Sequence, residues 1–144
     1  SNPFIEIERM VAYMKLRSSK QVIIECSLPA EAFVMLSVPL FDWVLENLIK
    51  NALDATEGAG KITIMASVQN KQVNITITDT GKGMDSKTAK QIFEPGYTTK
   101  KRGWGLGLPL SKRIMESYHE GKLFIKQTEP GKGTTFCLQL PLAN

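Results

Sequence analysis

The sequence predicts a single α+β domain, in which amphipathic helices and pairs of strands follow one another along 144 residues. Two observations lead to this class. Apolar residues recur at helical spacing over 3–18 and again over 41–55. Apolar and polar residues alternate over 62–77, with a turn in the middle, and the alternation returns over 121–128 and 134–140. The chain is long enough to bury one hydrophobic core.

The first half of the chain is predicted to contain two helices and two strands. After the helix over 3–18, a strand is expected over 21–27, where every second residue is apolar. A short buried strand is expected over 33–36. The central helix is expected to begin at Ser37 or Pro39, because proline is tolerated in a first turn, and to end in the glycine-rich turn over 57–60.

The second half begins with the hairpin over 62–77, whose turn is Asn70-Lys71. A short helix is expected over 86–93. Another amphipathic helix is expected from Leu108 onward, with Pro109 near its start. The last two strands are joined by a turn over 131–133.

Composition excludes several classes of protein. The chain is 42% hydrophobic and 22% charged, as in ordinary soluble domains, and its net charge is only +4. No apolar run approaches the ~20 residues of a membrane span, so we expect no direct membrane contact. The basic residues over 100–102 are accompanied by few aromatic residues beyond Trp104, which argues against nucleic acid as a partner. Cys26 and Cys137 lie in apolar strand patterns, which predicts buried thiols and a reducing, cytoplasmic location.

A polar stripe follows one edge of the central helix. Asn47, Asn51 and Asp54 are spaced i, i+4 and i+7, beside the apolar face of the same helix. This spacing places amide oxygens and a carboxylate in line at the boundary between core and solvent. Such a set could hold a hard cation, which prefers oxygen ligands. An ordinary solvated helix edge explains the stripe equally well.

Asp79 ends the second strand of the hairpin on the same side as its core aliphatic residues. An unpaired buried carboxylate is costly, so Asp79 should have a partner. It either caps the following turn or accepts a hydrogen bond from an amine of a ligand. Gly81 and Gly83 follow at once and allow the backbone to come close to a bulky or flat group.

Three alternate glycines, Gly103, Gly105 and Gly107, precede the helix that begins near Leu108. Free backbone N–H groups at a helix N-terminus favour an anion such as phosphate. The spacing matches neither the P-loop nor the dinucleotide-binding fingerprint.

These motifs, in this order, resemble the ATP-binding catalytic domain of bacterial two-component sensor histidine kinases. The five boxes of that family are similar to N-L-I-K-N-A-L-D-A, D-T-G-K-G-M, I-F-E-P-G-Y-T-T-K, G-W-G-L-G-L and G-K-G-T-T-F in this chain. The resemblance covers about residues 3–142, and the wider superfamily includes gyrase-type, Hsp90-like and MutL-like ATPases. It implies a two-layer α/β sandwich, with a mixed, mostly antiparallel sheet packed on three helices.

The resemblance also implies ATP and Mg²⁺ as ligands and assigns roles to residues. Asn51 would be the Mg²⁺ ligand, Asn47 would lie near the phosphates, Asp79 would accept the adenine amino hydrogen, and residues 94–105 would form a lid. The full set implied for catalysis and nucleotide binding is Asn47, Asn51, Asp54, Asp79, Gly81, Gly83, Met84, Phe93, Thr98, Thr99, Lys100, Gly103, Gly105, Leu106, Gly107, Leu108 and Thr135.

The residue at position 47 bears on the reaction. In hydrolysing members of the superfamily, a glutamate four residues before the Mg²⁺-binding asparagine activates water, and here that position is Asn47, an amide that is not a general base. The resemblance therefore implies transfer of the γ-phosphate to a histidine on a separate dimerisation domain, and from there to the receiver domain of a response regulator. The chain has no H-box, so we do not expect it to phosphorylate itself.

Three alternatives stay open at this point: a stand-alone ATPase, a serine-directed kinase of the anti-sigma type, and a non-catalytic nucleotide-sensing module. Two positions depart from the family pattern: Asp54, and Trp104, which is bulky where small polar residues are common. Asp54 stands where many members have a basic residue, which leaves neutralisation of the phosphates to Mg²⁺ and to the basic residues over 100–102. His119, the single histidine, is expected to be a surface residue at a helix end.

Overall fold

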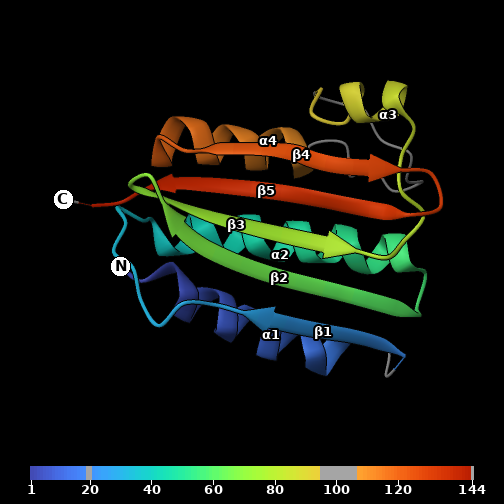
Figure 1. The fold of residues 1–144 in the computed structure, drawn as a ribbon, viewed down its shortest axis with the longest axis horizontal. Helices are drawn as coiled ribbons and strands as arrows, with labels where there is room; N and C mark the ends of the chain where they lie inside the picture. The colour runs from blue at the N-terminus through green and yellow to red at the C-terminus, as the bar shows by residue number, and fades with distance from the viewer. Residues whose placement is uncertain (19–20, 95–106, 144) are drawn as a thin grey trace.

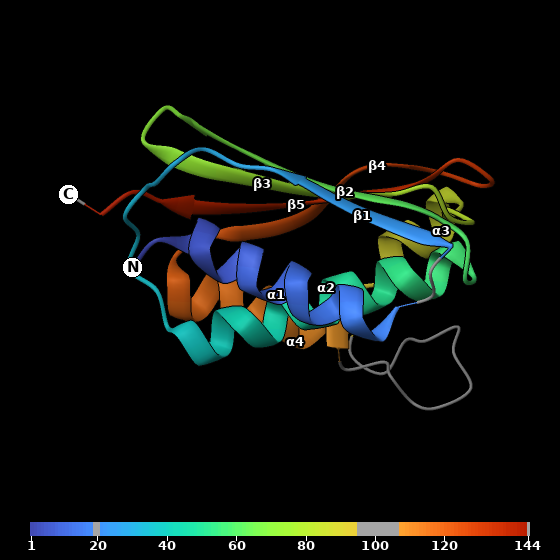
Figure 2. The same cartoon turned by 90° about the horizontal axis from the view of Figure 1, so that it is seen from below.

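The computed structural model describes residues 1–18, 21–94 and 107–143. They form a five-stranded sheet in the order β1-β2-β3-β5-β4 (Figure 1). Helices α1, α2 and α4 cover one face of this sheet, and the other face is open (Figure 2). The two-layer sandwich with a mixed sheet, which the sequence resemblance implied, is confirmed.

The helices begin and end at local signals in the sequence. Asn2 caps α1 (Pro3–Arg17) by accepting a hydrogen bond from the N–H of Phe4 at 3.0 Å. Helix α2 (Val38–Thr56) begins after Ser37, with Pro39 in its first turn, and ends at Glu57 in the left-handed conformation. The remaining helical elements are α3 (Ser86–Gln91), α4 (Gly107–Arg113) and the π-helix η1 (Ile114–Tyr118). Among the described residues, no helix has the length and the apolar character that a membrane span requires.

The sheet is antiparallel except at one edge. Strand β1 (Val22–Ser27) runs parallel to β2 (Gly60–Gln69). The predicted hairpin joins β2 to β3 (Gln72–Asp79) through Asn70 and Lys71, both at positive φ, as a tight hairpin turn requires. Strand β5 (Gly133–Pro141) lies between β3 and β4 (Lys122–Glu129).

The hydrophobic core lies between α2 and the covered face of the sheet. Most of the apolar face of α2 that the sequence predicted is buried, with Phe41, Val44, Leu45 and Leu48 at 0% exposure. It packs against core residues of β2, β3 and β5, including Ile62, Ile64, Ile75, Ile77 and Leu138. Because this face is fixed in the core, the neighbouring polar edge of α2 is held at the end of the sheet where β3 ends and β5 begins.

The two ends of the described chain meet at one short segment. The backbone of Ser1 and that of Val34 exchange two hydrogen bonds, at 3.0 and 3.1 Å. Ala143 donates to the carbonyl of Phe33 at 2.7 Å, and Val34 forms a single bridge with Leu142. The strand expected over 33–36 is therefore wrong: its pairing is limited to this bridge.

Two further expectations need correction. Cys137 is buried as predicted, but Cys26, near the end of the edge strand β1, is exposed. His119 is not a surface residue, since only 4% of it is exposed. Its Nε2 accepts a hydrogen bond from the N–H of Ser37 at 3.1 Å, and its Nδ1 lies 3.1 Å from the carbonyl oxygen of Ile114. This ring therefore joins the end of η1 to the start of α2.

Candidate functional site

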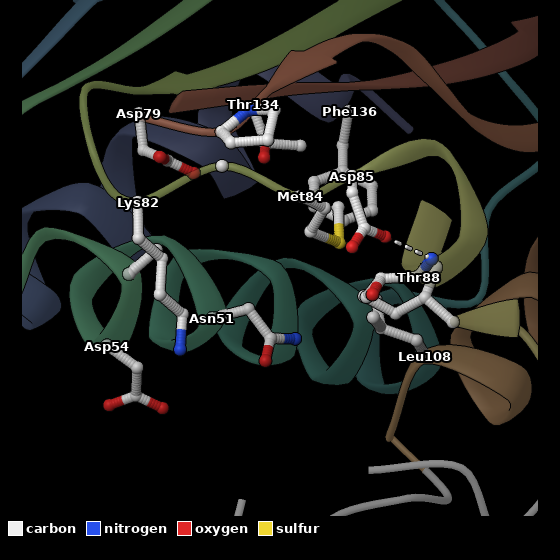
Figure 3. A pocket seen from close by; sticks show the side chains of 14 residues that line it. Asn51, Asp54, Asp79, Lys82, Met84, Asp85, Thr88, Leu108, Thr134 and Phe136 are labelled. Carbon is white, nitrogen blue, oxygen red and sulfur yellow. Dashed lines mark hydrogen bonds between the residues drawn. The ribbon is translucent and has the colours of Figure 1, made fainter. Parts of the chain in front are cut away.

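A cavity of about 310 Å³ lies between the second half of α2, the C-terminal end of β3 and the N-terminal end of β5 (Figure 3). Its walls come from parts of the chain that are distant in sequence. The lining residues are Asn51, Asp54, Ala55, Asp79, Lys82, Gly83, Met84, Asp85, Thr88, Ile92, Leu108, Pro130, Thr134 and Phe136. The cavity combines carboxylates and an amide with an apolar wall, which is the composition expected of a small-molecule site.

Asp79 supplies a buried carboxylate at this cavity. It is the last residue of β3, and the alternation of that strand turns its side chain toward the core, where only 4% of the residue is exposed. Its Oδ1 accepts a hydrogen bond from the N–H of Gly81 at 2.8 Å. Burial raises the pKa of Asp79 above its ordinary value, although backbone N–H groups of Gly81 and Thr134 lower it in part.

The loop after Asp79 passes very close to α2. The N–H of Lys82 donates to the carbonyl of Ala55 at 3.1 Å. A Cβ at Gly81 would collide with the same carbonyl oxygen, so this position requires glycine. The glycine therefore lets the loop lie directly on the helix that carries Asn51.

Gly83 is required for a related reason. Its φ is +66°, and a Cβ there would collide with the carbonyl oxygen of Glu129. The adjoining loop is also tied to the turn between β4 and β5: Gly131 donates to the carbonyl of Lys82 at 2.7 Å, and Met84 donates to Oγ1 of Thr128 at 3.0 Å. The protein's own backbone thus occupies the space beside Gly83.

The apolar wall consists of Met84, Ile92, Leu108 and Phe136. Phe93 does not line the cavity but supports this wall, because its ring packs edge-on against Phe136 with centroids 6.3 Å apart.

The structure brings together six of the residues that the sequence assigned to the site: Asn51, Asp54, Asp79, Gly83, Met84 and Leu108. Gly81 and Phe93 lie behind the walls. Asn47 and Gly107 contact each other next to the cavity, since a Cβ at Gly107 would lie 2.6 Å from Oδ1 of Asn47. The lid predicted over 94–105 lies outside the described residues except for Glu94, and so do the site residues Thr98, Thr99, Lys100, Gly103, Gly105 and Leu106.

The structure does not bring Thr135 to the cavity. Its hydroxyl is 3.0 Å from that of Thr78, on the open face of the sheet. The preceding residue, Thr134, pairs with Asp79 across the β3–β5 ladder and lines the cavity. Thr134 and Thr135 point to opposite faces because neighbouring side chains alternate along a strand.

Sequence reasoning missed several lining residues, among them Lys82, Asp85, Thr88, Thr134 and Phe136. Two of them had a signal: Thr134 and Phe136 share the alternation of the core-facing Leu138 and Leu140. Asp85 caps α3 by accepting from the N–H of Thr88 at 2.7 Å, which is a common helix start. The orientation of Lys82 had no local signal.

Comparison with known proteins identifies the class. Residues 38–144 match the family model described as histidine kinase-, DNA gyrase B-, and HSP90-like ATPase. The chain belongs to this family, which confirms the resemblance drawn from the sequence.

Curated relatives are kinases by name. Sporulation kinase C of Bacillus subtilis is 41% identical over 99 residues, which are 69% of this chain and 23% of that protein. Signal transduction histidine-protein kinase AtoS of Escherichia coli is 42% identical over 104 residues, 72% of this chain and 17% of that protein. The chain thus spans less than a quarter of the length of these relatives.

Solved structures agree with the fold. The catalytic domain of histidine kinase ThkA superposes with a TM-score of 0.87 at 26% identity, covering 98% of this chain and 93% of that one. The mycobacterial sensor histidine kinase MprB superposes with a TM-score of 0.86 over 99% of this chain and 95% of that one. At 20% identity, the likeness to MprB concerns the fold alone.

Proposed function

We propose that this domain binds ATP with Mg²⁺ and donates the γ-phosphate to a histidine on a separate dimerisation domain, which passes it to the receiver domain of a response regulator. Family membership and the names of the curated relatives support this proposal. Another structure of ThkA is a complex with the response regulator protein TrrA, which supports the kind of partner.

The observation that carries the proposal is the buried carboxylate of Asp79 beside an apolar wall. The adenine amino group would donate a hydrogen bond to this carboxylate while the ring lies against Met84 and Phe136. Guanine has a carbonyl oxygen at the corresponding position, and two facing acceptors repel each other. The cavity should therefore select ATP over GTP.

Asn51 is the residue we assign to Mg²⁺. An amide oxygen is a suitable ligand for this ion, which keeps several of its waters and takes further oxygens from phosphates. Among the described residues there is no group of three or more His, Cys, Asp or Glu side chains that could hold a metal. A single protein ligand fits an ion that is held jointly with the nucleotide, and the bound ion would neutralise charge on the phosphates.

Asn47 supports transfer of the phosphoryl group over hydrolysis, because an amide does not take a proton from water. In the proposed reaction a histidine nitrogen attacks the γ-phosphorus, the bond from that phosphorus to the bridging oxygen breaks, and ADP leaves. The histidine belongs to another domain, so this domain alone should bind ATP without phosphorylating itself. We place it in the cytoplasm, where ATP is available and where its two free thiols would stay reduced.

The test is calorimetric titration with ATP and with GTP, each with Mg²⁺, of the wild type, Asp79→Asn and Asp85→Asn. The last variant is a matched control, because it removes one carboxylate from the same cavity and keeps a residue that can cap α3. We expect tighter binding of ATP than GTP, and a loss of about tenfold or more only in Asp79→Asn (about 1.4 kcal/mol). Equal binding of both nucleotides, or equal losses in both variants, would contradict the role of Asp79.

A second experiment tests the transfer itself. The domain is mixed with Mg²⁺, γ-labelled ATP and the dimerisation domain of a histidine kinase, and label on histidine is measured. Label should appear only when both domains are present. Steady release of inorganic phosphate by this domain alone would favour a stand-alone ATPase instead.

A further inference from the structure

Lys82 is a cation at the cavity that the sequence did not assign to it. It lines the cavity, and its ammonium extends toward the α2 wall, between the side chains of Asn51 and Asp54 in the view of Figure 3. Among the described lining residues it is the only cation, whereas Asp54, Asp79 and Asp85 are acidic. An anionic ligand in such a cavity needs positive charge from the protein or from a metal ion.

The backbone of Lys82 is fixed on both sides. Its N–H donates to the carbonyl of Ala55 at 3.1 Å, and its carbonyl accepts from Gly131 at 2.7 Å. The flanking Gly81 and Gly83 leave no room for a Cβ, so the loop is in contact with α2 on one side and with the β4–β5 turn on the other. The side chain therefore starts from a defined position at the cavity, unlike that of a lysine in a loose loop.

We infer that Lys82 binds the phosphate groups of the nucleotide. The inference rests on the proposed function, in which Asp79 binds the adenine and Asn51 binds the Mg²⁺. The polyphosphate would then extend from Asp79 toward Asn51. The ammonium of Lys82 lies on that side of the cavity. A lysine ammonium is a compact charge with three donors, which suits phosphate oxygens.

This assignment gives the phosphate end a cation from the loop after β3. Asp54 places a negative charge on the α2 side of the cavity, at the position where many members of the family have a basic residue. Lys82 approaches from the opposite wall and brings the compensating charge to the same place. It would act on the nucleotide directly and is therefore a binding residue.

The test compares Lys82→Met with wild type in titrations with Mg²⁺-ATP, Mg²⁺-ADP and adenosine. We expect ATP affinity to fall about tenfold or more, as for loss of a hydrogen bond to a charged group, and ADP affinity to fall less. Adenosine affinity should not change, because adenosine has no phosphate. Lys82→Arg, which keeps the charge, should recover most of the ATP affinity.

Lys126→Met is the matched control. Lys126 lines a hollow on the open face of the sheet together with Met65 and Phe124, so this variant loses the same charge far from the nucleotide cavity. It should bind ATP as the wild type does. A similar loss in both variants would mean that only the net charge matters, and would overturn the inference.

Two other results would also overturn it: unchanged ATP affinity in Lys82→Met, or an equal loss for ATP and adenosine. Failure of the proposed function looks different, because the wild type itself would then bind neither ATP nor ADP. Thermal unfolding of each variant shows that it is folded before titration.

Discussion

The side-chain amide of Asn47 on α2 donates a hydrogen bond to the hydroxyl of Ser111 on α4 at 3.0 Å. Ser111 is fully buried, and its hydroxyl donates in turn to the carbonyl of Gly107 at 2.8 Å. This chain of hydrogen bonds holds the first turn of α4 against α2. Because Leu108 lies in that turn and lines the cavity, Asn47 helps to position a cavity wall.

Ser111→Ala should lower the free energy of unfolding by about 1 kcal/mol, since it removes both hydrogen bonds of the buried hydroxyl. Urea unfolding measures the change. The matched control is Ser117→Ala, which alters an exposed serine in η1 and should cost no more than about 0.5 kcal/mol. Equal effects of the two substitutions would show that the Asn47–Ser111 bond does not contribute to stability.

Asn47→Glu should raise the rate of ATP hydrolysis, because it introduces a carboxylate that can take a proton from water. Release of inorganic phosphate measures the rate. Asn47→Gln is the control, since it has the same length as glutamate but no basic group, and it should not gain activity. Parental rates in both variants would count against the role given to Asn47.

Gly83→Ala should be more destabilising than Gly131→Ala. Both glycines have positive φ, +66° and +79°, which costs an alanine about 1–2 kcal/mol. At Gly83 the new Cβ would collide with backbone, whereas no atom of the described residues lies within 4 Å of a Cβ at Gly131. Overpacking should add about 2 kcal/mol at Gly83. Denaturant unfolding measures both values, and equal losses would contradict the close approach to Glu129.

The ionisation of Asp79 should make stability depend on pH. Burial raises its pKa in the folded state, so the folded protein binds more protons than the unfolded chain between the ordinary aspartate pKa and this raised value. Stability from this group is therefore present at low pH and is lost as the pH rises through the raised pKa.

Asp79→Asn cannot titrate and serves as the reference for this measurement. We expect the free energy of unfolding of the wild type, minus that of Asp79→Asn, to increase as the pH is lowered from neutral. The difference should level off below the ordinary aspartate pKa. A difference that is constant, or that decreases on acidification, would be inconsistent with a raised pKa.

His119→Ala should lower the free energy of unfolding by about 2–6 kcal/mol. It would leave the N–H of Ser37 and the carbonyl of Ile114 without the bonds they form with the imidazole, and each buried unsatisfied group costs about 1–3 kcal/mol. The neighbouring Tyr118 is 64% exposed, so Tyr118→Ala should cost no more than about 0.5 kcal/mol. Similar losses in the two variants would contradict the structural role of His119.

A feature could be predicted from the sequence when it is determined within one helix or strand, and could not when it is determined by contacts with distant parts of the chain. The face of α2 and the inward direction of Asp79 follow from periodicity within one element, so both were predicted correctly. The outward face of Thr135 follows from the same alternation in β5, but the family resemblance assigned its role by position in a motif and did not use that alternation.

Lys82 and His119 depend on distant parts of the chain. Lys82 is oriented by contacts with Ala55 and Gly131, and no pattern within its own loop encodes them. The burial of His119 depends on Ser37, 82 residues away, and on the π-helix η1, which departs from the 3.6-residue period used to read helices.

Ser1 and Ala143 form backbone hydrogen bonds with the neighbouring residues Val34 and Phe33, so the two ends of the described chain lie together. Figure 1 shows both termini at one end of the sheet and α3, beside the cavity, at the other. A tag or a surface linkage added at either terminus would therefore lie away from the cavity and leave its walls unchanged.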